Sequence, residues 1–503
     1  MQEGFIAVLS SPACLCVICL GVVVGIIFGA IPGLSSTMAL VLFLPMTYAM
    51  TPVQGLSLLI ALYIGGMSGG LISAILLKIP GTPASMSTVW DGGPMAEKGE
   101  AGKALGVAIL VSFIGTLFGL IAMIFLSPQL AAFALQFTAY EYFAVALFSL
   151  SIIASLAGKD LINGLLSGLL GVLISMIGVT PIDAQIRFNF GSHQFDGGIG
   201  TVPMLIGLFA VSDIFIYGFK KSEGHLVPQN FKMKGFGIGM RELASQTVNI
   251  FRSSIVGVII GILPGIGGNT AGIFSYTLTK NSSKYPERFG TGIVDGLIAS
   301  ETSNNAVIGG SMIPMLTLGV PGNTVAAILL GGMTVKGITP GPLIFTKAGN
   351  IVYAMYMAML IATFAMLFFE FFGIRVFVRL LDIPKYLLFP AILSLCAVGC
   401  FGANNKTFDI VLMFVIGLGA FILRKLAIPT APLIIGYILG PMFEENLRRV
   451  LTLSKWRLSR FAAHPIAIVF FILAVLSIAQ AVYKNLKANR QISPDEAAPE
   501  EEV

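Results

Sequence analysis

The chain carries the stretch GIIFGAIPGLSST at residues 25–37 and a second version of it, GVIIGILPGIGGNT, at residues 257–270. Both contain Gly-x-x-x-Gly-x-x-Pro-Gly inside an apolar run, and small polar residues follow each Pro-Gly pair. Gly33 and Gly265 hold the same place in the two copies, at an offset of 232. Because proline and glycine interrupt helices, the sequence predicts two apolar helices that break at the same point.

Two further motif pairs follow in the same order. KIPGTPAS from Lys78 corresponds to GVPGNTVA from Gly319 at an offset of 241. VPMLIGLFA from Val202 corresponds to APLIIGYIL from Ala431 at an offset of 229. Three matches in one order and at nearly one offset predict an internal duplication.

The composition indicates a polytopic membrane protein. Of the 503 residues, 56% are hydrophobic and 11% are charged, which would leave a soluble fold without enough polar surface. The apolar stretches have about the 20 residues that a helix needs to cross a bilayer, and they lack the alternation of a transmembrane barrel. We therefore predict an all-α fold. No Lys or Arg precedes Lys78, so a cleaved signal peptide is not expected.

The cysteines, the net charge and the absence of known motifs disfavour several classes of function. The five cysteines have no nearby His or acidic residue that would complete a structural metal site. The net charge of +6 is spread over short loops without a nucleic-acid-binding motif. Neither the phosphate-binding Gly-x-x-x-x-Gly-Lys-Ser/Thr motif nor His-Glu-x-x-His occurs. We expect no enzyme and no cofactor, and a transport process driven by an ion gradient.

The first predicted repeat covers residues 1–219. It begins with a broken, re-entrant hairpin at about 13–50 and continues with five crossings, which we place at about 54–77, 104–126, 137–157, 161–180 and 199–219. The linker 220–252 is rich in Lys and Arg, which places it in the cytoplasm. Counting back five crossings puts the N-terminus outside, on the side opposite the cytoplasm.

The second predicted repeat covers residues 253–445 and has the opposite orientation. It begins with a hairpin at about 253–279 and continues with spans at about 292–318, 350–373, 386–402, 407–423 and 427–445. Residues 446–503 are interpreted as a loop at 446–461, a last helix at 463–483 and a disordered charged tail in the cytoplasm. The total is roughly 11–12 transmembrane segments. The loop is rich in arginine although the count places it outside, so either 427–445 is re-entrant or other charges set the orientation.

Small polar residues after each break would open a new helix. Free N–H groups and the positive end of the helix dipole bind anions such as carboxylates, and inverted repeats with broken helices form such sites near the bilayer midplane in secondary transporters. We therefore predict that an anionic substrate binds at the residues that follow the breaks. These are Gly33, Ser35, Ser36 and Thr37; Gly81 and Thr82; Gly265, Gly267, Gly268, Asn269 and Thr270; and Gly322, Asn323 and Thr324.

Glycines in these motifs also have a packing interpretation, because small-xxx-small patterns let membrane helices approach closely. Close packing is favoured for Gly25, Gly29, Gly257 and Gly261, which precede the breaks. It gives no reason for hydroxyls and amides behind the Pro-Gly pairs in both halves.

An ionisable residue at membrane depth is costly and indicates function. Glu301 in ASETSNNAVIGG is the main candidate, because Thr302, Asn304 and Asn305 follow it. These side chains could ligate a sodium ion, or Glu301 could carry a coupling proton. A polar cap at a helix end is the alternative.

Other charged residues are ambiguous. Lys78 precedes IPGTP and could pair with a substrate carboxylate, or its side chain could extend to the cytoplasmic surface. Glu370 stands alone in an apolar run, and we assign it no role.

The whole chain also resembles one known family. It is similar to the large membrane subunit of tripartite tricarboxylate transporters, the TctA family, over about residues 10–460. The matching runs are GIIFGAIPGLSSTMAL, YIGGMSGGLISAILLKIPGTPAS, DGGPMAEKGEAGKALG, FNFGSHQFDGGIGTVPMLIGLFAVSD, GILPGIGGNT, ASETSNNAVIGGSMIPMLTLGVPGNT and GPMFEENLRR.

This resemblance implies a bacterial inner-membrane permease that imports carboxylates such as citrate with sodium or protons. It also implies two partners, a small TctB-like membrane subunit with four helices and a periplasmic TctC-like substrate-binding protein. The choice of carboxylate, the coupling ion and its stoichiometry stay open.

Two other classes of membrane protein are alternatives to a carrier. A channel would share the hydrophobicity but would not need two oppositely oriented broken helices, and saturable, gradient-dependent flux would separate the two. A membrane scaffold or intramembrane enzyme is the third class. Loss of uptake on Asn269→Leu with assembly preserved would exclude a scaffold.

Overall fold

The computed structural model describes residues 2–155, 161–218, 235–265, 267–380, 385–455 and 457–491. Helices dominate these ranges, and the short strands β1 (Gly178–Val179) and β2 (Ile186–Arg187) form one antiparallel pair. Six helices in the described residues are long and apolar enough to cross a membrane, and six shorter apolar helices accompany them. The predicted all-α membrane fold is confirmed.

The chain forms two compact units that do not coincide with the two predicted repeats. The first contains residues 1–136 and 199–422. Its helices are α1 (Gln2–Leu9), α2 (Pro12–Ala30), α3 (Ser36–Phe43), α4 (Pro52–Leu76), α5 (Met86–Met95), α6 (Ala101–Ala134), α9 (Thr201–Leu205), α10 (Ser212–Gly218), α11 (Met240–Ser245), α12 (Thr247–Ile262), α13 (Gly267–Ser282), α14 (Val294–Leu318), α15 (Thr324–Val335), α16 (Ile344–Lys347), α17 (Gly349–Leu380), α18 (Lys385–Asn404) and α19 (Thr407–Lys425).

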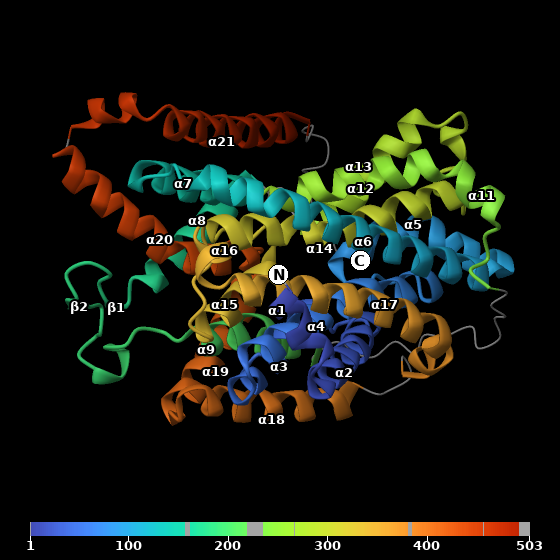
Figure 1. Ribbon diagram of the computed structural model, residues 1–503, viewed down its shortest axis with the longest axis horizontal. Helices are drawn as coiled ribbons and strands as arrows, with labels where there is room; N and C mark the ends of the chain where they lie inside the picture. Colours follow the sequence, from blue (N-terminus) through green and yellow to red (C-terminus); the bar gives the residue numbers. More distant parts are fainter. Residues whose placement is uncertain are drawn as a thin grey trace, which may run out of the picture. The chain divides into compact units, whose positions relative to one another are not determined.

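The second unit contains residues 137–198 and 423–503. Its helices are α7 (Ala139–Ser155), α8 (Leu161–Ser175), α20 (Thr430–Ser454) and α21 (Pro465–Gln491). Helix α20 packs against α7 and α8, and α21 lies alongside α7 (Figure 1). Helices from both halves of the sequence therefore share this unit.

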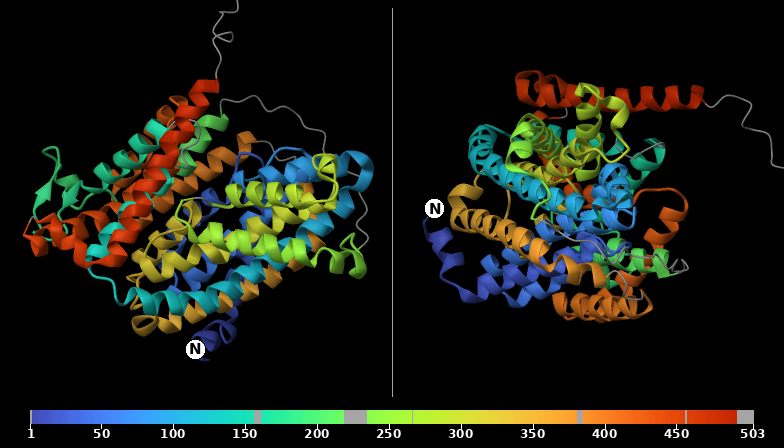
Figure 2. Two further views of the ribbon diagram at one scale, coloured as in Figure 1. Left: turned by 90° about the horizontal axis from the view of Figure 1, so that it is seen from above. Right: turned by 90° about the vertical axis from the view of Figure 1, so that its right-hand side faces the viewer.

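Both Pro-Gly pairs break a helix as predicted. Helices α2 and α12 end just before them, and α3 and α13 begin just after them. Gly33 and Gly265 have φ angles of 97° and 81°, a conformation that glycine adopts without steric cost. Figures 1 and 2 show the two arms of the second hairpin, α12 and α13, side by side. The opposite membrane orientation of the two halves stays a prediction.

Close approach of backbones explains the glycines before the breaks. A Cβ on Gly29 of α2 would overlap the carbonyl oxygen of Gly66 on α4, and a Cβ on Gly257 of α12 would overlap that of Ser303 on α14. The packing interpretation of these glycines is confirmed. Each hairpin is thereby fixed to the helix that follows it in the chain.

The same contact recurs at the second break of each half. A Cβ on Gly81 would overlap the carbonyl oxygen of Gly29, and a Cβ on Gly322 would overlap that of Gly261. Helices α5 and α15 begin shortly after these breaks. Matching contacts at matching positions agree with the duplication inferred from the motifs.

One predicted loop is wrong at its start. Residues 446–461 were expected to leave the helix, but α20 continues to Ser454. Its charged residues pair along one helix face, where Arg448 binds Glu444 at 2.9 Å and Arg449 binds Glu445. Pairs four residues apart stabilise a helix, so the charges extend α20 instead of ending it.

Candidate functional site

The two hairpins meet at the side chain of Met67 on α4. The Ser36 hydroxyl at the start of α3 lies 3.9 Å from the Met67 sulfur. At the start of α13, the position of a Cβ on Gly268 would lie 2.9 Å from Met67 Cε. The structure therefore brings together the two helix starts that follow the Pro-Gly pairs.

Two further helix starts lie beside Gly267 and Gly268, at the start of α13. The Cβ position of Gly268 lies 3.1 Å from Ala84, in the one-turn helix that leads into α5. The Cβ position of Gly267 lies 3.6 Å from Asn323, the N-cap of α15. We call the starts of α3, α5, α13 and α15, with Met67 and Asn304 between them, the central cluster.

Capping side chains hold the first turns of α3 and α15 in place. Ser35 Oγ accepts a hydrogen bond from the Met38 amide at 3.1 Å, and Asn323 Oδ1 accepts one from the Ala326 amide at 2.8 Å. The side-chain amide of Asn323 also donates to the hydroxyl of buried Tyr63 at 2.6 Å. Ser35 and Asn323 therefore hold the helix starts in place, a role typical of N-caps.

Several polar atoms of the central cluster have no partner. Asn304 is fully buried, and neither its side-chain oxygen nor its nitrogen makes a hydrogen bond in the described part of the chain. The same holds for Thr82 Oγ1 and Asn269 Oδ1, and for Thr302 Oγ1 elsewhere on α14. Leaving such a group unpaired costs about 1–3 kcal/mol, so the cluster offers hydrogen bonds that a solute or water would satisfy.

The remaining predicted residues lie at the breaks themselves or in the first turns of the helices that follow. Gly265 donates its amide to the carbonyl of Gly322 at 2.8 Å, which joins two of the breaks. Thr37, Thr270 and Thr324 lie in the first turns of α3, α13 and α15.

Glu301 lies at the centre of a buried polar network. Its carboxylate accepts hydrogen bonds from Thr88 of α5, from Ser112 of α6 at 3.0 Å and from Asn305 at 3.3 Å. The side chain is fully buried in α14. The alternative of a polar cap at a helix end does not describe this position, because three side chains from three helices surround the carboxylate.

Glu370, to which the sequence alone assigns no role, is a second buried acid. It is fully buried in α17, one oxygen accepts a hydrogen bond from Ser68 of α4 at 2.8 Å, and the other oxygen has no partner among the described residues. Its signal was a single acidic residue within an apolar run. Ser68 belongs to a Gly-x-Ser-x-Gly pattern, GMSGG, but it lies inside α4 and not at the strand-to-helix turn that this motif requires in hydrolases.

Basic residues are kept apart from the central cluster. Within the described ranges, the buried side chains include no Lys or Arg. The ammonium of Lys78 binds the carboxylate of Glu97, and the Lys78 side chain is 43% exposed. No group of three or more His, Cys, Asp or Glu in the described residues could hold a metal ion.

Comparison with known proteins places the chain in a family. The model of the tripartite tricarboxylate transporter TctA family matches residues 15–435. The chain belongs to the TctA family. It is therefore a membrane component of a tripartite transporter, a system that includes other subunits.

Relatives of this TctA protein occur in Agrobacterium vitis. One, an uncharacterized 52.8 kDa protein in the TAR-I ttuC' 3' region, is 33% identical over 470 residues, which cover 93% of each chain. A second, an uncharacterized protein in the TAR-II ttuC' 3' region, is 35% identical over 234 residues, 46% of this chain and 97% of the relative. No solved structure matches the chain.

Proposed function

We propose that this TctA protein is the permease subunit that imports tricarboxylates or related carboxylates across the bacterial inner membrane, coupled to a sodium or proton gradient. A periplasmic binding protein would deliver the substrate, and a small membrane subunit would complete the complex. The observation that carries this proposal is the meeting of four helix starts around Met67, with unpartnered polar atoms on buried side chains between them.

The central cluster suits a carboxylate for two reasons. Each helix start presents free amide N–H groups and a partial positive charge of about half an elementary charge. The side-chain amide of Asn304 can add a further donor beside Gly268. A carboxylate would thus be held by backbone and amide dipoles, which desolvate at lower cost than a buried Lys or Arg.

Glu301 supports the coupling part of the proposal. A buried carboxylate is costly unless a cation or a proton neutralises it. Side-chain oxygens of Thr302, Asn304 and Asn305 have no partners in the described structure, and oxygen is the ligand that hard cations prefer. Sodium at these oxygens, or a proton on Glu301, would link ion movement to occupation of the neighbouring anion site.

Transport would follow alternating access, in which the core that carries both hairpins moves between two states. Cysteines introduced by Ser36→Cys and Asn269→Cys should change their accessibility to aqueous reagents between sodium-loaded and sodium-free protein. Equal accessibility in both states would rule out this motion. The N-terminus is expected in the periplasm and the C-terminus in the cytoplasm.

A charge placed in the cluster tests the proposed function. Asn304→Asp has nearly the same shape as asparagine but repels a carboxylate, so uptake of radiolabelled citrate by the reconstituted three-subunit complex should fall at least tenfold, the equivalent of about 1.4 kcal/mol. Asn350→Asp, on an exposed residue at the start of α17, is the matched control. Wild-type uptake by the assembled Asn304→Asp complex would refute the anion site.

A further inference from the structure

One face of α13 runs from the central cluster to the protein surface. Gly268, Gly272, Tyr276 and Lys280 follow one another at intervals of four residues, so they lie on the same side of the helix. The first two have no side chain, the third is a buried aromatic residue and the fourth is a half-buried cation. The two glycines are closely packed, because a Cβ on Gly268 or Gly272 would lie 2.5 Å from a side-chain oxygen of Asn304 or Ser87. This face therefore changes from close glycine contacts to an aromatic ring and then to a charge along its length.

Helix α5 and the turn before it follow this face. Ala84 lies opposite Gly268, as described above, and the Ser87 hydroxyl lies 2.5 Å from the Cβ position of Gly272. One turn further, the rings of Trp90 and Tyr276 meet edge to face, with centroids 4.8 Å apart. We call this line of contact between α5 and α13 the α5–α13 seam.

The inner part of the seam carries polar atoms without partners. The hydroxyl of Ser87 is buried and makes no hydrogen bond in the described residues, and the same is true of the Ser300 hydroxyl and of both side-chain atoms of Asn304. The backbone of Ser300 approaches the Cβ position of Gly272 at 3.7 Å. Unpaired polar groups therefore continue from the central cluster along the glycines of α13.

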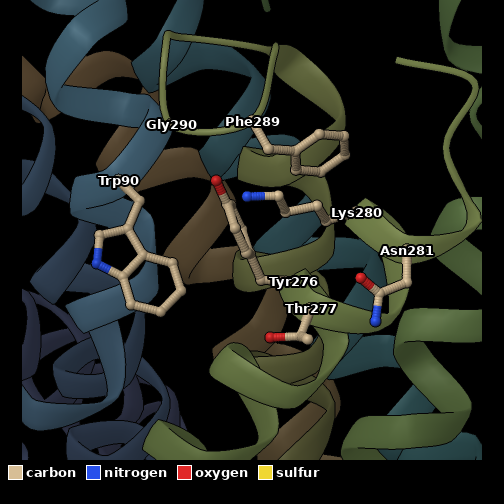
Figure 3. A pocket seen from close by; sticks show the side chains of 7 residues that line it. All are labelled: Trp90, Tyr276, Thr277, Lys280, Asn281, Phe289 and Gly290. Atoms are coloured by element: carbon tan, nitrogen blue, oxygen red, sulfur yellow. The ribbon is translucent and has the colours of Figure 1, made fainter. Parts of the chain in front are cut away.

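Aromatic rings lie at the outer end of this row of unpaired polar groups. Besides Trp90, Tyr276 contacts Phe289 edge to face at 5.4 Å, and Tyr276 is only 5% exposed. Beyond the rings lies a pocket of about 550 Å³ (Figure 3). Its lining residues are Trp90, Tyr276, Thr277, Lys280, Asn281, Phe289 and Gly290.

Lys280 gives the pocket a positive charge. Figure 3 shows its side chain directed toward the hydroxyl end of Tyr276. No acidic side chain in the described part of the chain pairs with Lys280. Asp91, which lies with Tyr276 against Gly296, directs Oδ1 to three amides of the loop 290–293, at 2.8–3.0 Å. The other carboxylate oxygen of Asp91 makes no hydrogen bond in the described residues. Neither oxygen pairs with Lys280, so its ammonium can meet an anion.

We propose that the α5–α13 seam is the path by which the carboxylate leaves the central cluster for the cytoplasm. Trp90 and Tyr276 close this path, and Lys280 binds the departing anion in the pocket. The inference rests on the proposed function, and the basic residues after α13 that place its end in the cytoplasm support the direction.

Removal and restoration of the pocket charge test the path. In wild-type complex containing the small membrane subunit and the binding protein, uptake of citrate or another di- or tricarboxylate must first be measurable, and its absence for all of them would refute the proposed function instead. The carboxylate that is taken up is then used for the variants. Lys280→Gln should then slow uptake about tenfold, whereas Lys284→Gln, on the exposed neighbouring lysine, should not. Lys280→Cys should be equally slow and should recover when aminoethyl methanethiosulfonate restores an ammonium group.

Closure of the path by Trp90 and Tyr276 is tested separately, by measuring leak of substrate. Trp90→Ala removes the ring that covers Tyr276 and should increase the leak of preloaded citrate from vesicles several-fold in the absence of a gradient. Equal uptake by Lys280→Gln and Lys284→Gln, or unchanged leak in assembled Trp90→Ala, would overturn the path. An effect of Lys280→Gln that occurs only in vesicles with anionic lipids would also overturn it, because the pocket would then bind a lipid headgroup.

Discussion

Asn304 of α14 and Gly268 of α13 face each other so closely that a Cβ on Gly268 would lie 2.5 Å from the Asn304 side-chain oxygen. The first residue comes from the polar run of the predicted span 292–318, and the second comes from the break of the second hairpin. Their proximity joins the proposed anion site to the proposed ion ligands. Glycine at position 268 is therefore required for this close approach of α13 to α14.

Gly268→Ala should therefore fill the central cluster. The added methyl group would meet Asn304, Met67 and Ala84 within about 3 Å, and we expect citrate uptake to fall at least tenfold. Gly402→Ala is the control, because a Cβ there meets nothing within 4 Å. The measurement is the initial uptake rate at equal amounts of assembled complex. Equal rates for both variants would show that position 268 does not border the substrate.

Glu301→Gln should uncouple transport from its driving ion. The amide keeps the shape of the carboxylate but cannot hold a proton or neutralise a cation. We expect accumulation against a gradient to be lost while exchange of citrate across the membrane continues. Parallel measurements of net accumulation and of exchange would test this, and full accumulation by Glu301→Gln would remove Glu301 from the coupling mechanism.

Glu370 should act as a protonated, neutral residue. It receives one hydrogen bond, from Ser68, whereas Glu301 receives three, and a buried carboxylate with so few donors is costly. Glu370→Gln should therefore leave the melting temperature within about 2 °C of wild type or raise it, since no charge is lost. A loss of several degrees would show that Glu370 is ionised and paired in the folded protein.

The second compact unit depends on a partly buried ion pair. Arg187 binds Glu444 through two hydrogen bonds, and their side chains are 17% and 10% exposed. Without Arg187 the Glu444 carboxylate keeps only Arg448 as a partner, so Arg187→Met should lower the melting temperature. Lys103→Met, which breaks the more exposed pair with Glu242, should change it little. Similar losses in both variants would contradict this difference.

Motif comparison located the breaks of this fold because Pro-Gly pairs act locally. Proline removes a backbone donor and glycine permits the positive φ found at Gly33 and Gly265, so both helix ends could be read from the sequence. The helical extension of α20 was missed because its arginines suggested a loop, although their spacing from Glu444 and Glu445 allows helical ion pairs.

Tertiary partners of the site could not be read from local patterns. Nothing in the sequence links Ser68 to Glu370 across 302 positions, or Thr88 to Glu301 across 213. Met67 is an ordinary apolar residue of its helix, and only packing shows that both hairpins contact it. The site residues predicted from the breaks are brought together by α4 and α14, whose close contacts depend on the whole fold.

The meeting of the two hairpins at an anion site is tested most directly by substrate protection of both helix starts. In complex lacking its native cysteines, single Ser36→Cys and Asn269→Cys variants should react with a small aqueous thiol reagent, and saturating citrate should slow both reactions at least tenfold. Protection of both positions would show that one solute covers both hairpins. Reaction rates that citrate leaves unchanged at either position, in complex that still takes up citrate, would contradict the account.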